Sequence, residues 1–157
     1  MFLLMPLRVG LVHLLMLVFG FCVACSIAKT SDRSKPFPVG DYDYTSYDEK
    51  GGKVVQGRIS ITSSELRRIG SEQTTQLKGN WELKKVGNQE HIGNQEGKGE
   101  LVGSLVEDDI SLNLNPNTAD ANVYLRGKPD GKGFRGTWSF NGEGGPISHG
   151  TFEAVRK

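Results

Sequence analysis

From residue 39 to the C-terminus, apolar side chains recur at every second position of the sequence. A two-residue period is that of a β-strand with one buried face and one solvated face, and it differs from the period of a helix. Eight such stretches can be distinguished, near residues 40–47, 55–61, 77–84, 101–105, 110–114, 123–125, 134–140 and 152–154. The pattern therefore predicts an all-β domain.

The segments between these stretches contain turn-forming residues. The chain has 21 glycines, and the pairs Asp130-Gly131 and Asn141-Gly142 are typical of tight hairpins. Eight short strands with mostly short connections predict an antiparallel meander that closes, or nearly closes, into a β-barrel. A two-sheet β-sandwich is the alternative. The sequence GNQE occurs at 87–90 and again at 93–96, which indicates a local duplication in a flexible loop.

One segment has a second interpretation. Residues 62–65 fit a helix capping box, Leu66 and Ile69 are three positions apart, and Gly70 could end a helix. A helix of one or two turns is therefore possible here, with an extended hairpin as the alternative.

Two of the expected strands carry a glycine two positions before a tryptophan, at Gly79-Asn80-Trp81 and Gly136-Thr137-Trp138. Because such a glycine points to the same face as the tryptophan, we expect each indole to lie over bare backbone. These G-x-W strands resemble those of the calycin group of barrels, which includes lipocalins and avidins. The resemblance implies a calycin-like barrel.

The first 24 residues have the pattern of an export signal. Arg8 is the only formal charge before Lys29, and residues 10–24 are apolar except for His13. An apolar run of about 15 residues spans only about 22 Å as a helix, short of a hydrocarbon core of about 30 Å. A cleaved hydrophobic signal peptide is therefore expected. A retained N-terminal membrane anchor is the alternative.

Residues 22–25, Cys-Val-Ala-Cys, resemble the lipobox of bacterial lipoproteins. In that class the cysteine becomes the first residue after cleavage, and its thiol carries a diacylglycerol. Ala24 and Ser26 fit the pattern, whereas Cys22 stands where an aliphatic residue is usual. The resemblance implies lipidation of Cys25 and, since Ser26 follows it, sorting to the outer membrane. Cleavage before Cys25 would also leave a single thiol with no intrachain partner, which lipidation explains. A plain secreted protein is the alternative.

These features divide the chain into a signal peptide (1–24), a lipidated cysteine with a flexible tether (25–38) and a β-barrel domain (39–157). Phe37 could hold the end of the tether against the domain. The whole chain has 19 Lys and Arg against 18 Asp and Glu, and removal of Arg8 makes the numbers equal. A neutral domain without a basic stripe does not favour nucleic acid as a partner. We expect a lipid-anchored protein of the bacterial cell envelope.

Aromatic residues are the candidate ligand-binding groups. Trp81, Trp138, Phe134, Phe140 and Phe152 are expected to face inward, where they form the core or line a cavity for an apolar ligand.

Three tyrosines lie close together near the start of the domain. Tyr42 and Tyr44, with Tyr47, either sit on a strand with their hydroxyls at the rim or form a platform for a sugar or peptide.

The sequence offers little for catalysis, for a metal or for another cofactor. His91 and His149 are the histidines left after cleavage, and neither has a second ligand at zinc spacing. The loop at 115–122 is rich in oxygen ligands but lacks an EF-hand spacing for calcium. No phosphate-binding loop or nucleophile motif is present, so we do not expect an enzyme.

Two functions remain. The first is a membrane-anchored barrel that binds an apolar small molecule or a partner protein, such as a protease or hydrolase that it inhibits. The second is a structural envelope lipoprotein that acts in an assembly without a ligand.

Overall fold

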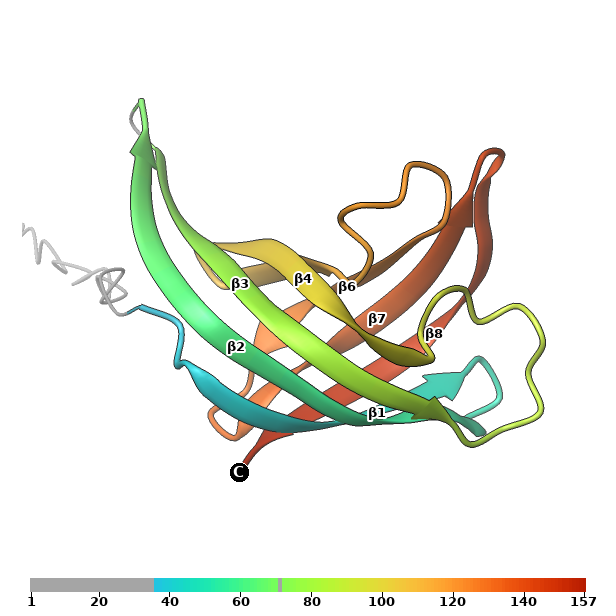
Figure 1. The fold of residues 1–157 in the computed structure, drawn as a ribbon. Helices are drawn as coiled ribbons and strands as arrows, with labels where there is room; N and C mark the ends of the chain where they lie inside the picture. The colour runs from blue at the N-terminus through green and yellow to red at the C-terminus, as the bar shows by residue number, and fades with distance from the viewer. Residues whose placement is uncertain (1–35, 71) are drawn as a thin grey trace, which may run out of the picture. The chain divides into compact units, whose positions relative to one another are not determined.

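The computed structural model describes residues 36–70 and 72–157. The predicted signal peptide, Cys25 and most of the tether lie outside these residues. The described residues form eight strands (Figure 1). They are β1 (Gly40–Asp48), β2 (Lys53–Ile69), β3 (Glu72–Lys85), β4 (Gly97–Val106), β5 (Asp109–Asn113), β6 (Asn122–Pro129), β7 (Gly133–Gly142) and β8 (Gly145–Arg156). Within residues 36–70 and 72–157, no helical segment has the length and apolar character that a membrane span needs.

The strands form a closed antiparallel barrel in sequence order. Each strand pairs with the next, and β1 pairs with β8 from Tyr42↔Arg156 to Asp48↔Gly150. The predicted eight-stranded closed meander is therefore confirmed, and the sandwich alternative is wrong. Closure requires β8 to return beside β1, which gives both strands a partner on each side.

The inward-facing side chains follow the predicted period of two. On β3, Leu77, Trp81 and Leu83 are buried, whereas Lys78 and Glu82 between them are exposed. The same alternation on the other strands produces one apolar core inside the barrel. The sequence pattern thus reports burial directly, because successive strand residues point to opposite faces.

Residues 62–69 are part of β2, so the short-helix interpretation is wrong. The register shifts between Ile61 and Ser63 and then continues from Ser64↔Leu77 to Ile69↔Glu72. Pairing with β3 satisfies the backbone groups of this segment that point toward β3, which outweighs the local capping signal. Figure 1 shows that the resulting β2–β3 hairpin extends beyond the neighbouring strands.

The connections divide the barrel into two different ends. At one end β4–β5 and β6–β7 are joined at residues 107–108 and 130–132, and β1 starts and β8 finishes there. We call this the tether end. At the opposite end, the loop end, β3–β4 and β5–β6 are joined by residues 86–96 and 114–121 (Figure 1).

Candidate functional site

Aromatic side chains fill the half of the barrel nearer the tether end. The ring centroids of Tyr42 and Phe134 are 5.3 Å apart, and those of Phe134 and Phe152 are 5.7 Å apart, both edge to face. Tyr44 stacks on Phe152 at 5.7 Å. The structure therefore brings four of the predicted aromatic residues into one buried cluster. Tyr42 and Tyr44 are each 1% exposed, so they do not form an exposed platform.

Phe37 closes the tether end. Its ring lies 6.0 Å from Tyr42 and 5.7 Å from Phe134, and only 4% of the residue is exposed. The Tyr42 hydroxyl donates a hydrogen bond of 2.6 Å to the Pro38 carbonyl, which holds the same segment. Phe37 thus packs against the domain, and the chain is fixed to the barrel before β1 begins.

Each of the two tryptophans connects three neighbouring segments of the barrel by packing and by a hydrogen bond. Trp138 of β7 lies against Gly150 of β8, and its Nε1 donates to the Tyr47 carbonyl of β1 at 2.8 Å. Trp81 of β3 lies against Gly99 of β4, and its Nε1 donates at 2.6 Å to the Leu114 carbonyl, which follows β5. Each indole therefore lies across a glycine of the neighbouring strand and donates a hydrogen bond to the segment beyond that strand.

This arrangement corrects one detail of the G-x-W expectation. A Cβ on Gly79 would first meet the backbone of Ser60, and one on Gly136 would first meet that of Arg126. The glycines next to the indoles are instead the cross-strand partners Gly99 and Gly150. Pairing between strands, which the local spacing does not contain, decides which glycine accommodates each ring.

Phe140 has a different role from the other predicted aromatic residues. It is partly buried and packs against the edge of the core at the loop end. A Cβ on Gly93 of the β3–β4 loop would lie only 2.4 Å from its ring, and Gly93 has a φ of 67°. Both facts require glycine at this position, and they show that the loop lies directly on β7.

The β3–β4 loop, residues 86–96, reaches across the loop end. The amide of Val86 donates to the Val54 carbonyl at 2.9 Å, and the Ser148 hydroxyl of β8 donates to the His91 carbonyl. The Asn115 side chain donates to the Asn94 carbonyl at 3.0 Å. These contacts tie the loop to three other segments, so the expected flexible loop is packed on the barrel.

Ile92 and Gln95 anchor this loop, although neither was among the residues expected to be functional. Ile92 is 5% exposed and Gln95 is fully buried, with its Nε2 donating to the Ile92 carbonyl at 2.6 Å. An apolar residue inside a polar, glycine-rich loop was the signal that could have identified them. Only the second GNQE copy places its glutamine in the interior.

The β5–β6 loop is held by asparagine side chains. Asn115 accepts a hydrogen bond from the Val123 amide at 3.2 Å, and Asn122 donates to the Thr118 carbonyl at 3.0 Å. The Asn113 side chain in turn donates to Asn122 at 2.9 Å. The oxygen-rich sequence considered for calcium thus forms its own turn, and no three His, Cys, Asp or Glu side chains among the described residues gather as a metal site.

Two buried hydroxyls on the inner face of β1 have no hydrogen-bond partner beyond each other among the described residues. They belong to Tyr44 and Ser46, which are two positions apart on the strand. Burial raises the pKa of the Tyr44 phenol well above its usual value of 10.0, and the nearby Ser46 hydroxyl offsets part of this rise. The Gln95 side-chain oxygen and the Asn141 side-chain oxygen are likewise buried without partners.

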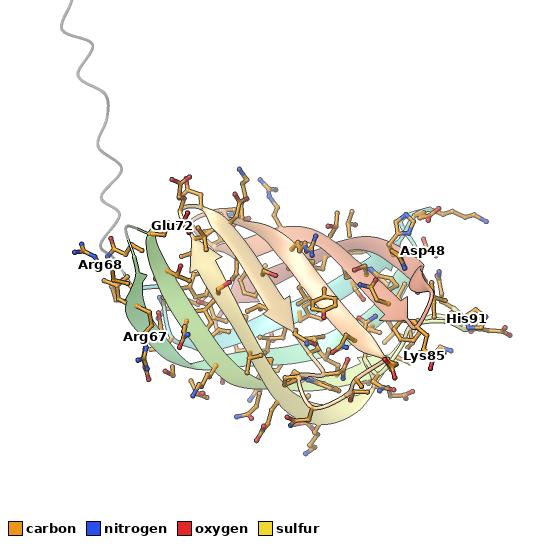
Figure 2. The ribbon with its side chains drawn as sticks, turned by 90° about the horizontal axis from the view of Figure 1, so that it is seen from above. Asp48, Arg67, Arg68, Glu72, Lys85 and His91 are labelled. Atoms are coloured by element: carbon orange, nitrogen blue, oxygen red, sulfur yellow. The ribbon has the colours of Figure 1, made fainter. Side chains whose placement is uncertain are left out.

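The exposed surface of the loop end carries charges of both signs. Figure 2 shows Asp48, Lys85 and His91 at this end and Arg67, Arg68 and Glu72 at the other. The His149 Nε2 lies 2.9 Å from the Glu49 carboxylate, joining β8 to the β1–β2 turn. His91 and His149 therefore both lie at the loop end, where they make separate contacts.

Among the described residues, three grooves can be distinguished on the outside of the barrel. Two of them cross β2, β3 and β4 and share Arg58, Glu82 and Lys98, and the third lies over β5 and β6. The Lys98 ammonium lies 3.1 Å from the Glu82 carboxylate within the shared part. The described residues that line these grooves include no convergent set of catalytic groups.

Comparisons with protein-family models, with curated proteins and with solved structures found no significant match to this chain.

Proposed function

We propose that the chain is an exported, lipid-anchored protein of the bacterial envelope whose barrel recognises a partner protein at the loop end. The observation that carries this proposal is the asymmetry of the barrel. The N-terminal segment joins the domain at the tether end, where Phe37 is buried, and the longer loops are all at the opposite end. A lipid on Cys25 would leave these loops free to meet another protein.

The construction of the loops supports a protein partner. Residues 86–96 and 114–121 are held by buried side chains and by mutual hydrogen bonds, including the bond from Asn115 to Asn94. A surface fixed before binding loses less conformational entropy when a partner docks. The exposed mixture of acidic and basic groups suits a polar protein surface better than an apolar molecule.

The anchor is tested by lipid labelling. Cells producing the full chain are grown with radiolabelled palmitate, and Cys25→Ser is compared with the unchanged chain. We expect label in the unchanged chain, none in Cys25→Ser, and an uncleaved precursor in the presence of globomycin. An unlabelled wild-type chain would remove the anchor from the proposal.

The recognition surface is tested by charge reversal. Glu90 and Glu96 are exposed at the loop end, and Glu72 and Asp108 are exposed at the tether end, which makes a matched pair of double variants. In crosslinked membranes, Glu90→Lys with Glu96→Lys should reduce recovery of the partner. Glu72→Lys with Asp108→Lys should not. Equal effects of the two double variants would contradict a loop-end site.

A small-molecule site inside the barrel is the second candidate. The buried hydroxyls of Tyr44 and Ser46 support it, because they have no partner beyond each other and buried polar groups normally have their hydrogen bonds satisfied. The ligand would need a polar group for these hydroxyls, in addition to apolar surface against Trp138 and Phe152. A native mass spectrum of the purified chain tests this candidate: a bound mass lost in Tyr44→Phe supports it, and a homogeneous unliganded species contradicts it.

A further inference from the structure

The β2–β3 hairpin presents an open sheet edge. β1 pairs with β2 only as far as Gly40↔Ile61, whereas β3 pairs with β2 up to Ile69↔Glu72. On the β1 side of residues 62–69, no strand from the described residues continues the sheet. We call residues 62–69 the open edge of β2. Such an edge is a template for another strand.

The backbone groups that point out of this edge can be identified from the register. Only two residues separate β2 from β3, so the flanking pair Ile69↔Glu72 exchanges hydrogen bonds, and every second pair does the same. The backbone groups of Glu65 and Arg67 therefore point to β3. Those of Ser64, Leu66 and Arg68 point outward.

The side chains along the open edge are self-complementary. Glu65 and Arg67 lie on the same face, with the Arg67 guanidinium 2.8 Å from the Glu65 carboxylate, and their side chains are 53% and 57% exposed. The Arg67 guanidinium also holds the pKa of Glu65 below its usual range, mainly through this hydrogen bond. Leu66, between them on the opposite face, is 47% exposed.

We infer that two copies of this chain pair antiparallel along the open edge of β2, with Leu66 of one copy opposite Leu66 of the other. In this register the outward backbone groups of Leu66 bond to one another, and those of Ser64 bond to those of Arg68 in the second copy. Glu65 then faces Arg67 of the second copy, and the reverse pair forms at the same time. Four charges of alternating sign meet on one face of the joint sheet.

The neighbouring registers are disfavoured. Residues whose backbone groups point outward must lie opposite such residues in the second copy. One copy can therefore shift along the other only by two residues at a time. A shift in one direction places Glu65 opposite Glu65 of the second copy. A shift in the other direction places Arg67 opposite Arg67 of the second copy. Like charges directly opposite each other are unfavourable, and the charges therefore select the register centred on Leu66. This inference does not depend on the lipid anchor or on loop-end recognition.

Disulfide trapping tests the central pair. The full chain with Cys22→Ser, Cys25→Ser and Leu66→Cys is oxidised in detergent, and Val102→Cys in the same background is the control, since Val102 is 40% exposed on β4. The proposed pairing places the Cα atoms of position 66 in the two copies within disulfide range, so crosslinking should be at least about tenfold faster than in the control. Equal rates, or an adduct with a different protein when the test is made in cells, would overturn the inference.

Charge exchange tests the register. Glu65→Arg and Arg67→Glu are introduced separately into the Leu66→Cys chain. Each variant alone should lose the fast crosslinking, because like charges then face each other. A mixture of the two variants should regain it, and so should the double variant Glu65→Arg with Arg67→Glu. Fast crosslinking by either single variant alone, or a mixture that stays slow while the double variant is folded, would contradict the proposed pairing.

Discussion

The two ends of the barrel are closed by different means. At the tether end, Phe37 packs on Tyr42 and Phe134, and the closure is made of aromatic surface. At the loop end, the β3–β4 loop buries its own Ile92 and Gln95 and is tied mainly by hydrogen bonds to carbonyl groups. Apolar burial is strong but insensitive to direction, whereas hydrogen bonds fix the loops in one conformation. The loop end therefore presents a surface of defined conformation.

The largest effect is expected from breaking the aromatic closure. Phe134 contacts three other rings in the cluster, so Phe134→Ala should lower the free energy of unfolding by about 3–5 kcal/mol. Urea unfolding of the purified chain measures this change. Val155→Ala, at a side chain that is 44% exposed, is the control and should change stability by less than about 0.5 kcal/mol. A loss below that of the control would show that the cluster is not the closure described here.

A smaller loss of stability is expected from a substitution at the loop end. In Gly93→Ala, a new Cβ would meet the Phe140 ring, and a φ of 67° is unfavourable for alanine. We expect a loss of about 2–4 kcal/mol and faster hydrogen exchange in residues 86–96. Gly131→Ala has a comparable φ of 83° and no atom within 4 Å, so it should lose only about 1–2 kcal/mol. Equal losses would mean that the loop does not press on Phe140.

The smallest effect at neutral pH concerns the interior between the two closures. Tyr44→Phe removes a buried hydroxyl whose only polar neighbour is the Ser46 hydroxyl, so the free energy of unfolding at pH 7 should change by less than about 1 kcal/mol. Burial raises the pKa of Tyr44, which means that the unfolded chain loses this proton first as the pH rises. The stability contribution is complete below pH 10 and falls above it by up to about 1.4 kcal/mol per pH unit. Urea unfolding at pH 7 and pH 11 should therefore show a shallower decline for Tyr44→Phe, and parallel declines would contradict this account.

The class of fold and the inward faces could be predicted from the sequence, because apolar residues at every second position indicate a β-strand with one buried face. Alternation over residues 77–84 predicted one inward face there, and Leu77, Trp81 and Leu83 are buried on that face. The same local signals failed at residues 62–69, where a capping pattern competed with strand pairing. Propensity within a few residues is weak compared with the hydrogen bonds that β3 supplies.

The candidate sites were less predictable. The aromatic residues were recognised individually, yet the sequence could not tell that Tyr42, Tyr44, Phe134 and Phe152 form one cluster, since β1 meets β7 and β8 only on closure. Gln95 was missed because polar loop residues are normally solvated, and only the contacts of Ile92 and Gly93 with the barrel explain its burial.

By itself, the sequence determined most of the strands, their buried faces and several of the turns between them, because these depend on the period of side chains and on residues next to one another. The tertiary structure decided which strand ends meet, which glycine lies under each tryptophan, and which edge of β2 is left open. Those features depend on registers between strands that are far apart in the chain, and register is fixed only when the whole barrel closes.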